Sequence, residues 1–599
     1  MSHHADVTEL AKRRGFFFAA AEAYGGAAGF YTFGPEGAAL KRNVEAAWRD
    51  RFALKEDNEE IAAPTVMPEP VFEASGHLDT FDDMLVECPE CGESHRADHL
   101  VEDATDLEDA EALGTEEVAE LIAEHELTCP ACGAELGGQE VEEFNLMFET
   151  SIGPGSGQPG YLRPETAQGI FVEFPRLKEY ARGKLPFGVT QIGPAYRNEI
   201  SPRRGLIRVR ELTQAELEQF VDPETDEPDL EKVEDVELRL YAAPEQAEDA
   251  PPEAGYQELT VAEAVEENVV ASDWVAYYLG VAQEWYERIG VDTDQLRFRQ
   301  HLPGERAHYA ADCWDAEAKI ESAGGDWIEI AGFSTRSDYD LSKHAEASGE
   351  SFTVFKQYDE PRTVERSTVD PDMSTLGPEF GGDAGAVAEA LEELAERDPD
   401  AFHDDDVAVA VDGEEYTVDT DVANFEIVEE TEAGEHITPH VIEPSFGVDR
   451  TVYTLIDHGL QRDELGGEPR DFLSLAPEMA PTDVAVFPLV SNHEPLLDTA
   501  SEVVSTLRSA GFDATRDDSG SIGRRYRRQD EVGTPFCVTV DRDGLEDDPT
   551  TVTLRDRDTG AQARIPVGEL VGQLEALRDG DADFEALLSR YETVETADE

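Results

Sequence analysis

Two pairs of cysteines carry the clearest metal-binding pattern in the sequence. Cys88 and Cys91 form one CPxCG segment, and Cys129 and Cys132 form a second. Each segment places two thiols on a tight turn, and four thiolates can close a tetrahedral zinc site that leaves no open position for catalysis. The 37 residues between the pairs exceed the spacing of a zinc ribbon, so they must form a small structure of their own. The pattern predicts a structural zinc site, with four buried or redox-active thiols as the alternative.

Arginines gather between residues 186 and 220, although the chain as a whole contains few positive charges. Guanidinium groups match the geometry of phosphate oxygens. We expect residues 206–211 to be the returning strand of a β-hairpin with arginine on one face, because apolar residues and arginines alternate there. A salt-bridged surface hairpin is the alternative. The arginines are Arg197, Arg203, Arg204, Arg208 and Arg210, and the accompanying glutamates are Glu199, Glu211 and Glu216.

Residues 439–450 predict a strand, a glycine turn and a helix that carries Arg450 in its first turn. This order brings Glu443 and Ser445 on the strand close to the positive end of a helix. Arg450 opposes the helix dipole there, so it requires an anionic partner. An ordinary strand–turn–helix junction with a solvated arginine is the alternative.

Apolar periodicity predicts the elements around these segments. Residues 35–54 predict a helix with Trp48 on its buried face, and residues 61–66 predict a strand that Pro64 confines to an edge or an interface. After residue 480 strands and helices alternate, which favours a small α/β domain. Its expected elements are the strands 484–489 and 536–540 and the helices 496–507 and 565–577.

Acidic residues dominate the composition. The chain has 135 Asp and Glu against 47 Lys and Arg, which gives a net charge of −88. Such a chain repels itself at low salt, whereas at about 1 M salt the Debye length is about 3 Å and the repulsion is screened. We interpret the composition as an adaptation to the cytoplasm of a salt-loving organism; a basic partner protein is the alternative. Apolar residues make up 40% and no apolar run reaches 18 residues, so we expect a folded protein without a membrane span.

Together these segments resemble the three motifs of the class II aminoacyl-tRNA synthetases, and within them the glycyl-tRNA synthetases of archaeal and eukaryotic type. The predicted helix to Trp48 and the strand with Pro64 resemble motif 1. Further similar segments span roughly half the chain, and their number and order make a chance similarity implausible. They are residues 15–37, which resemble the opening segment of those enzymes, 161–169 (YLRPETAQG), 190–216 (motif 2), 439–450 (motif 3) and 517–541 (anticodon-binding domain).

The resemblance implies an α+β class II synthetase core, an antiparallel sheet flanked by helices, with zinc-binding and acidic insertions and a C-terminal α/β anticodon-binding domain. It divides the chain as follows. Residues 1–85 would hold the first part of the core, 86–140 the zinc-binding insertion, 141–221 the core with motif 2, 222–326 an acidic and helical insertion, 327–345 a core segment, 346–435 a second insertion, 436–480 the core with motif 3, and 481–599 the anticodon-binding domain.

The resemblance also implies a bent ATP with bridging Mg²⁺. Arg197 would hold the α-phosphate, Glu199 would meet the adenine end and Arg450 would contact the γ-phosphate side, and these three are the implied catalytic residues. Leu212 stands where the family usually has an aromatic that stacks on adenine, so either Leu212 packs the ring or another aromatic does. The other implied ATP-binding residues are Asn198, Ile207, Arg208, Val209, Arg210, Glu211, Glu329, Ile330, Gly447, Val448 and Asp449.

The implied amino acid is glycine. By similarity, glutamates would receive its ammonium group, and crowding at Cα would reject alanine sterically. The implied glycine-binding residues are Arg96, Glu165, Leu212, Thr213, Gln214, Ala215, Glu216, Glu443, Pro444, Ser445, Phe446 and Gly447.

The implied activity is glycine–tRNA ligation in the cytoplasm by a homodimer: glycine and ATP give glycyl-adenylate and pyrophosphate, and glycine then passes to the 3′ end of tRNA-Gly. The structural zinc would be separate from this chemistry. Arg524, Arg525, Arg527 and Arg528 would bind tRNA around Tyr526, whose ring would stack on a base, with an internal salt-bridge network as the alternative.

Three other functions remain as alternatives. A catalytically inactive, synthetase-like accessory subunit that binds tRNA would be marked by loss of Arg197, Arg450 or Glu443, and all three are present. A synthetase for another small amino acid and a zinc-ribbon nucleic-acid binder without catalysis are the other two.

Overall fold

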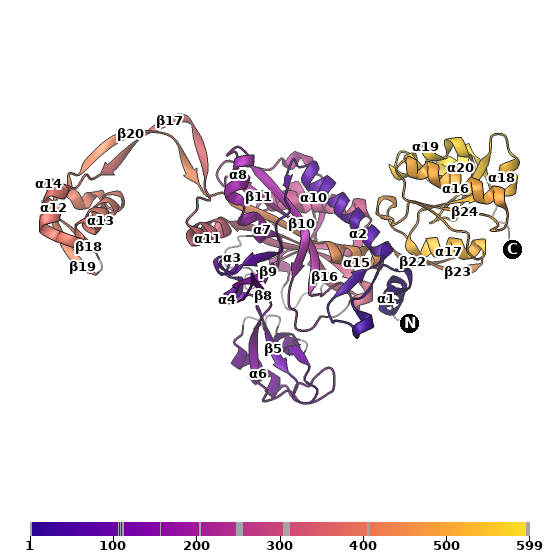
Figure 1. Cartoon of the computed structure of the whole chain (residues 1–599), viewed down its shortest axis with the longest axis horizontal. Helices are drawn as coiled ribbons and strands as arrows, with labels where there is room; N and C mark the ends of the chain where they lie inside the picture. Colours follow the sequence, from indigo (N-terminus) through magenta and orange to yellow (C-terminus); the bar gives the residue numbers. More distant parts are fainter. Residues whose placement is uncertain are drawn as a thin grey trace. The chain divides into compact units, whose positions relative to one another are not determined.

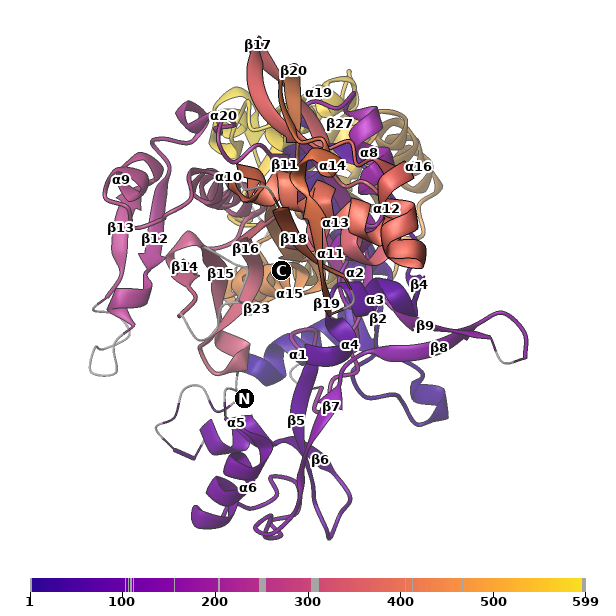
Figure 2. The same ribbon diagram turned by 90° about the vertical axis from the view of Figure 1, so that its left-hand side faces the viewer.

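The computed structural model (Figures 1 and 2) divides the chain into two compact units. The main unit contains residues 1–181, 185–352 and 439–599, and the inserted unit contains residues 182–184 and 353–438. The structure describes residues 3–594 except 103, 106, 108–109, 111–112, 156, 203–204, 247–254, 303–311, 404–405, 412 and 466.

A mixed sheet forms the centre of the main unit. In the described residues its strand order is β13-β12-β14-β15-β16-β21-β11-β10-β3, and all neighbours are antiparallel except β12/β14 and β3/β10. Figure 2 shows several of these strands lying side by side. The strands are β3 (Glu59–Glu60), β10 (Phe187–Tyr196), β11 (Glu211–Val221), β12 (Glu237–Tyr241), β13 (Gln257–Thr260), β14 (Leu296–Gln300), β15 (Cys313–Ile320), β16 (Asp326–Ser337) and β21 (His440–Gly447).

Helices cover both faces of this sheet, as expected. One face packs against α2 (Pro35–Trp48), α10 (Asp273–Ile289) and α15 (Val448–Gly459), and the other against the short helices α7 (Ala167–Phe171) and α11 (Tyr339–Ser348). The prediction of a helix over 35–54 is confirmed, since α2 continues as a π-turn from Arg49 to Leu54.

Stacked aromatic rings fill the core between the sheet and the first helical layer. The Phe52 ring lies 5.1 Å from Trp48 and 4.7 Å from Phe446, centroid to centroid. Trp285 of α10 meets Phe52 edge-on at 5.9 Å. Four large side chains from α2, its π-turn, α10 and β21 therefore meet at one point and hold these helices to the sheet.

The predicted β-hairpin exists, but its returning strand lies further along the chain than we expected. β10 pairs with β11 over ten positions, from Phe187↔Phe220 to Tyr196↔Glu211. The expectation that residues 206–211 form that strand is wrong for all but Glu211. Ile207 and Val209 alternate with arginines in the sequence, but this segment is a loop. It buries Leu206 and Val209, to 2% and 6% exposure, and leaves Ile207 half-buried.

The predicted strand over residues 61–66 is also wrong. The chain pairs with β10 only at Glu59–Glu60 and then leaves the sheet. Pro64 has no N–H to donate, and the N–H of Ala63 donates to the side chain of Gln191 at 2.6 Å. Pairing resumes in a separate three-stranded sheet of β4 (Val66–Pro68), β8 (Phe148–Ile152) and β9 (Gln158–Leu162).

Residues 222–326, which we expected to form an insertion, supply β12, β13, β14 and β15 to the central sheet. The acidic composition of this range hides that role, because its exposed residues are acidic while the buried faces of the strands are apolar. Leu238, Leu240, Phe298 and Trp314, for example, are at most 1% exposed.

The segment around the cysteines has a small apolar core of its own. Val86, Val101, Val118 and Ile122 are buried there together with Cys88. This agrees with the expectation that the residues between the two cysteine pairs form a separate structure. Its elements are β5 (Asp82–Glu87), β6 (Ser94–Arg96), β7 (Val141–Asn145), α5 (Ala97–Glu102) and α6 (Thr115–Glu124).

The C-terminal part of the main unit is the expected α/β domain, with sheet order β25-β24-β26-β27-β28-β29. The predicted strands at 484 and 536 and the helix at 496 are confirmed. The last predicted helix begins at Val567 because residues 562–566 belong to a strand. The elements are β24 (Val484–Pro488), α16 (Glu494–Ser509), β25 (Ala514–Arg516), α17 (Ile522–Val532), β26 (Phe536–Val540), α18 (Arg542–Glu546), β27 (Thr551–Asp556), β28 (Gln562–Pro566), α19 (Val567–Arg578), α20 (Phe584–Arg590) and β29 (Glu592–Thr593).

The inserted unit is a long two-stranded ribbon that ends in a small helical head (Figure 1). Leu376, Val387, Leu391 and Val407 form its apolar core. The ribbon strands are β17 (Val354–Thr368) and β20 (Glu426–Ile437), and the head contains α12 (Met373–Phe380), α13 (Ala384–Arg397), β18 (Asp406–Val411), β19 (Glu414–Asp419) and α14 (Thr420–Ala423).

Shorter elements complete the main unit, and none of the described helices is long and apolar enough to cross a membrane. These elements are α1 (His3–Arg14), β1 (Phe17–Ala19), β2 (Tyr31–Phe33), α3 (Glu69–Ala74), α4 (His77–Thr80), α8 (Phe174–Tyr180), α9 (Val261–Glu266), β22 (Leu460–Leu465) and β23 (Glu468–Leu473).

The aromatic junction yields a first prediction. Phe52→Ala removes a fully buried ring, so we expect the free energy of unfolding of the core to fall by about 3–5 kcal/mol. Tryptophan fluorescence during denaturation in about 2 M KCl measures this, because all five tryptophans lie between residues 48 and 327. Phe355→Ala, which removes a 46% exposed ring of the inserted unit, is the control and leaves this transition in place. A loss below about 1 kcal/mol for Phe52→Ala would contradict the assignment.

Candidate functional site

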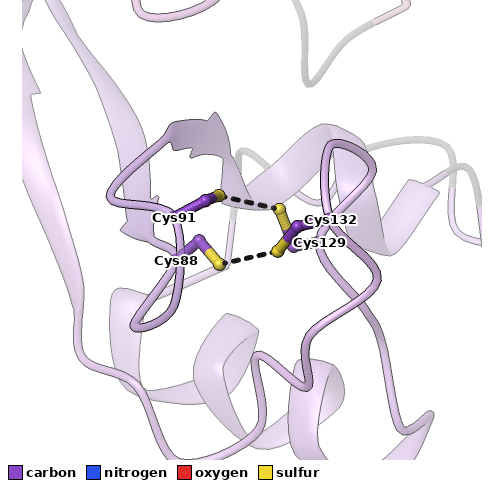
Figure 3. Close-up of side chains that lie close together, drawn as sticks. All are labelled: Cys88, Cys91, Cys129 and Cys132. Carbon is purple, nitrogen blue, oxygen red and sulfur yellow. Dashed lines mark hydrogen bonds between the residues drawn. The ribbon is translucent and has the colours of Figure 1, made fainter.

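The four predicted cysteine ligands converge in the structure. All four sulfur atoms lie within 4.8 Å of one another, and Figure 3 shows them pointing together from two loops. Cys88 lies 3.5 Å from Cys132, and Cys91 lies 3.7 Å from Cys129, sulfur to sulfur. A tetrahedron with Zn–S bonds of about 2.3 Å has edges of about 3.8 Å, so the set has the size of a zinc site.

The loops that carry the cysteines have the same turn. The N–H of Gly92 donates to the carbonyl of Cys88, and the N–H of Gly133 donates to that of Cys129. Both glycines have positive φ, +72° and +76°, which explains why each CPxC is followed by glycine. The N–H of Cys91 also hydrogen-bonds the Cys88 sulfur and lowers the pKa of that thiol to about 6, toward the thiolate that a metal needs.

A second candidate site is a cleft lined by three arginines, which we call the arginine cleft. Arg197 follows β10, Arg208 lies in the loop between β10 and β11, and Arg450 lies in the first turn of α15. Convergence of three guanidinium groups suits an anion with several charges. The lining residues are Arg197, Glu199, Leu206, Ile207, Arg208, Val209, Leu212, Thr213, Gly447, Asp449 and Arg450.

Carboxylates hold the arginines in place. Nε of Arg208 donates to Glu199 at 2.6 Å. Arg450 donates to the carbonyl of Ile207 at 3.0 Å and to the Glu329 carboxylate at 3.0 Å. The predicted anionic partner of Arg450 is therefore Glu329. Burial raises the pKa of Glu329, but Arg450 and Arg197 outweigh it and hold that pKa below its usual range.

Not every residue expected to bind ATP reaches the cleft. Arg210 donates to the backbone carbonyls of Glu199 and Ala28 and is not among the lining residues. Ile330 and Val448 are 1% exposed and pack into the core. Glu211 is exposed at the start of β11, and Asn198 is held by its N–H to the carbonyl of Leu146. Leu212 does line the cleft, and no lining residue is aromatic. Among the described residues, the lining therefore contains no ring that could take the place of the aromatic residue expected to stack on adenine.

Behind the cleft lies a group of buried acids on the sheet face under α7 and α11, which we call the carboxylate cluster: Glu165, Glu216, Glu218, Asp340 and Glu443. Glu216 accepts hydrogen bonds from the Thr166 hydroxyl, from the N–H of Ala167 at 2.6 Å and from the Ser445 hydroxyl at 2.6 Å. Gln168 donates to Glu165 at 2.9 Å.

Arg336 is the cation at the centre of this cluster, and sequence reasoning missed it. It donates to both oxygens of Glu443, at 3.1 and 3.0 Å, and to both oxygens of Asp340, at 2.7 and 3.0 Å. It occupies a bulge of β16, between Thr335 and Ser337. Strand periodicity does not predict where a bulged side chain points, so no sequence signal was available.

Burial and mutual repulsion raise the pKa values of two acids of the cluster, whereas neighbouring cationic groups lower the pKa of a third. Burial, opposed by Arg336 and reinforced by Glu216, raises the pKa of Glu443 to about 8. Burial and the neighbouring Glu165 also raise the pKa of Glu216. Burial acts on Glu165 as well, but His77, whose Nε2 is 3.7 Å away, and Arg336 outweigh it and hold the pKa of Glu165 far below its usual value. The cluster therefore carries fewer negative charges than carboxyl groups.

Several residues expected to bind glycine lie away from the cluster. Phe446 and Ala215 face the opposite side of the sheet and are buried in the aromatic core. Arg96 is bound to Asp83 and Asp98, and Asp83 joins it to Arg208 at the arginine cleft. Thr213 contacts Lys41 and Asp449, and Pro444 and Gly447 belong to β21. Gln214 shares the strand face of Glu216.

Lys41 is a further residue that the sequence did not reveal. It donates to the hydroxyl of Thr213 at 2.6 Å and pairs with Asp449 at 2.8 Å. It lies on α2, more than 400 residues from Asp449, so only the tertiary structure could show the pairing.

The basic segment of α17 is largely occupied by internal contacts. Arg525 is 1% exposed and donates to three backbone carbonyls, and the Tyr526 hydroxyl bonds to Thr539 at 2.6 Å. Arg527 pairs with Glu468 at 2.6 Å, and Arg528 pairs with Asp517. These contacts agree with the internal network that we held as the alternative. Arg524 is exposed, and Arg203 and Arg204 of the β10–β11 loop lie outside the described residues.

The pairing of Arg336 yields a second prediction. Arg336→Gln leaves Asp340 and Glu443 buried without a cation, so we expect a loss of about 3–5 kcal/mol in the free energy of unfolding at pH 8. The loss shrinks toward pH 5, because burial raises the pKa of Glu443 in the folded state, so that protonation of this acid restores part of the stability. Arg462→Gln, in the exposed pair Arg462–Asp471, serves as control and costs about 1 kcal/mol or less. Equal losses at both pH values would show that the charge is not the cause.

Comparison with known proteins gives the family context for this geometry. The chain matches the tRNA synthetase class II core domain (G, H, P, S and T) over residues 156–244 and the anticodon binding domain over residues 483–577. Among solved structures it resembles prolyl-tRNA synthetase from Cryptosporidium parvum, complexed with L-proline and AMP (TM-score 0.50, 12% identity, 98% of this chain and 75% of that chain). It also resembles Giardia lamblia prolyl-tRNA synthetase in complex with prolyl-adenylate (TM-score 0.51, 15%, 95% and 74%). These likenesses show the fold.

Sequence relatives are much closer. Glycine–tRNA ligase of Methanothrix thermoacetophila is 48% identical over 98% of this chain and 98% of its own length. The enzymes of Methanothermobacter thermautotrophicus (48%, 96% and 99%) and Methanocaldococcus jannaschii (46%, 95% and 98%) are similar over comparable shares. The expected class II core with a C-terminal anticodon-binding domain is thereby confirmed. The chain belongs to the glycine–tRNA ligase family of class II aminoacyl-tRNA synthetases.

Proposed function

We propose that this chain joins glycine to tRNA-Gly at the expense of ATP, with the arginine cleft as the ATP site and the carboxylate cluster as the site of the glycine ammonium group. The observation that carries the assignment is that both sites lie along the same two strands. On β11, Leu212 lines the cleft and Glu216 belongs to the cluster; on β21, Gly447 lines the cleft and Glu443 belongs to the cluster. Four residues of a strand span about 13 Å, which places an amino acid beside the phosphates of a nucleotide.

The chemistry requires no enzyme nucleophile. The glycine carboxylate attacks the α-phosphorus of ATP, pyrophosphate leaves, and the tRNA 3′ hydroxyl then attacks the acyl carbon of the adenylate. Arg197 is our candidate for stabilising the charge that develops on the α-phosphate, and Arg450 for holding the γ-phosphate side. Mg²⁺ bound with ATP would supply charge neutralisation of the phosphate oxygens, and Glu329, which pairs with Arg450, is the carboxylate on that side of the cleft. Glu199 is our candidate for the adenine end.

Selectivity for glycine follows from the way the cluster is held. Hydrogen bonds from Thr166, Ala167 and Ser445 fix the Glu216 carboxylate at 2% exposure. A substrate methyl group would displace buried, bonded side chains, so rejection of alanine is steric. An apolar pocket that relied on one missing methylene would discriminate by only about 1–3 kcal/mol.

The activity test is amino-acid-dependent ATP–pyrophosphate exchange with Mg²⁺ in about 2 M KCl. We expect exchange with glycine and none with alanine or serine. Arg450→Gln and Arg197→Gln should each reduce kcat by about 100-fold or more, because each removes a charged contact to the reacting phosphates. Arg462→Gln, on an exposed pair, is the matched control. A folded protein that binds tRNA-Gly without any exchange would instead be the accessory subunit.

We also propose that the four cysteines bind a structural zinc ion, supported by the sulfur separations and by the number of thiols, since four protein ligands fill a tetrahedral zinc site. His95, whose Nε2 lies 3.2 Å from the Cys129 sulfur, would hydrogen-bond a ligand and steady it. Zinc there would fix the small domain beside the arginine cleft and would supply no chemistry to the reaction.

Two further properties are proposals. Leu54 at the end of the π-turn that continues α2 is 76% exposed, which supports a homodimer that covers apolar surface next to motif 1. The net charge of −88 supports a cytoplasm of high salt, where the repulsion is screened.

The zinc proposal has a direct measurement. We expect about one zinc per chain by elemental analysis, and Cys91→Ser or Cys132→Ser should lower the content and the stability of the domain, since three ligands hold zinc less tightly than four. Cys313→Ser is the control and keeps the full zinc content, because Cys313 belongs to β15. A wild-type protein purified without metal, with its domain folded and full exchange activity, would contradict the proposal.

A further inference from the structure

Glu218 is a buried carboxyl group without a hydrogen-bond partner. Its side chain is 0% exposed, and neither of its oxygens is hydrogen-bonded. It lies on β11 two residues after Glu216, so both side chains point to the sheet face that holds the carboxylate cluster. A buried ionised carboxylate with no donor is strongly unfavourable, so the position requires an explanation.

The strand register places Glu218 opposite Glu443. The pairs Glu216↔Ser445 and Gln219↔Ile442 flank this position on β11 and β21. Side chains directly opposite each other have Cβ atoms about 5 Å apart. Side chains do meet across these strands, since Ser445 donates to Glu216 at 2.6 Å one position along the same face.

Hydrogen-bond donors are distributed unequally among the acids of the cluster. Asp340 and Glu443 share Arg336, and Glu216 accepts three hydrogen bonds. Glu165 accepts from Gln168 and faces His77. Glu218 has none of these, and burial followed by the nearby Glu443 raises its pKa well above the usual range. Among the acids of the cluster, Glu218 is therefore the one whose protonation gives up no hydrogen bond or ion pair.

We propose that Glu218 is a positioning residue of the glycine site: it is held as the neutral acid and donates its O–H to the carboxylate of Glu443, which receives the substrate ammonium group. This inference rests on the proposed function for the identity of the substrate. A neutral donor fits the position better than a second cation, because it fixes the Glu443 carboxylate without competing with the ammonium group for its charge. Arg336 binds Glu443 from β16, and Glu218 would bind it from β11.

Charged groups face this pair from the elements packed against it: Arg336 from β16, Asp340 from α11, Glu216 from β11, and Glu165 from the segment before α7. His344 of α11 lies next to Asp340, and Gln168 of α7 binds Glu165. His344 hydrogen-bonds Gln168, and burial lowers its pKa, so it adds no positive charge near pH 7. Glu443 is thus the group whose ionisation follows pH, and Glu218 is the donor that favours its ionised form.

Paired substitutions separate hydrogen bonding from packing. Glu218→Gln keeps a donor of similar shape, so we expect the KM for glycine to stay within about 3-fold of wild type. Glu218→Leu fills similar space without a donor, so the KM for glycine should rise about 10-fold or more while the KM for ATP stays unchanged. Glu237→Gln, an exposed acid on β12, is the matched control. Equal KM values in the Gln and Leu variants would mean that Glu218 only fills space, and an increase of about 100-fold in Glu218→Gln would mean that its charge binds the substrate.

The pH profile tests positioning directly. Ionised Glu443 binds the ammonium group, so the KM for glycine should be low above the pKa of Glu443 and rise below it. A hydrogen bond to the ionised form lowers a carboxyl pKa. Glu218→Leu removes this hydrogen bond, so the pH at which the KM for glycine begins to rise should move to higher pH. The shift should be about one pH unit if the hydrogen bond changes the KM by 10-fold. In Glu218→Gln the rise in the KM for glycine should begin at the same pH as in the wild type or at lower pH. If this pH is also unchanged in Glu218→Leu, the proposal is overturned.

Infrared spectroscopy provides a readout that does not depend on activity. At about pH 9 we expect the carbonyl stretch of one protonated carboxyl in the wild type, and its loss in Glu218→Gln. Persistence of that band in Glu218→Gln would overturn the assignment of the neutral acid. If the wild type shows the band but no glycine-dependent exchange, the proposed function fails while the neutral Glu218 stands.

Discussion

The pairing of β11 with β21 is the constraint on which both candidate sites depend. Six paired positions, from Gln214↔Gly447 to Val221↔His440, set which side chains face each layer of helices. In this register Phe446 enters the aromatic core and Ser445 reaches Glu216 on the other face. A slip by one residue would exchange the two faces, so it would bury carboxylates among tryptophans and expose phenylalanine to the substrate site. The hydrophobic core thus specifies the geometry of the polar site.

Acid plays two different physical roles in this chain. On the surface, most of the 135 acidic residues are solvated, and salt screens their repulsion. The acids of the carboxylate cluster are at most 17% exposed, so salt screens them little, and Arg336, hydrogen bonds and protonation offset their repulsion instead. The large net charge therefore gives little information about the site, whereas the few buried arginines give a great deal.

A residue of the site could be predicted from the sequence when the residues that fix its position lie close to it in the chain. The four cysteines and the β21–α15 junction with Arg450 are short segments whose spacing determines their geometry, and the C-terminal domain follows from simple alternation of strands and helices. The β10–β11 hairpin was predicted in kind but misplaced, because Leu206 and Val209 are buried by a loop that mimics a strand pattern. That error concealed Glu218, because it ended the expected strand at Glu211, whereas β11 begins there and runs to Val221 with Glu216 and Glu218 on one face. Arg336, on a bulge, and Lys41, paired with a residue more than 400 positions away, have no local signal at all.

The scarcity of cations also constrains how such a chain can hold RNA. Of its 38 arginines, eight described ones are at most 8% exposed, and several of them bind buried acids or backbone carbonyls. Arg555, for example, pairs with Asp530 at 2.8 Å in the anticodon-binding domain, and Arg525 binds only carbonyls there. Arginines that are buried in this way do not contact RNA phosphates, so they do not contribute to the release of counterions from RNA. Each phosphate contact made by a cation lowers the logarithm of affinity by about 0.7 to 0.9 for each tenfold rise in salt. Because fewer arginines are available for such contacts, we expect shape, stacking and neutral hydrogen bonds to contribute more to the recognition of tRNA in this chain.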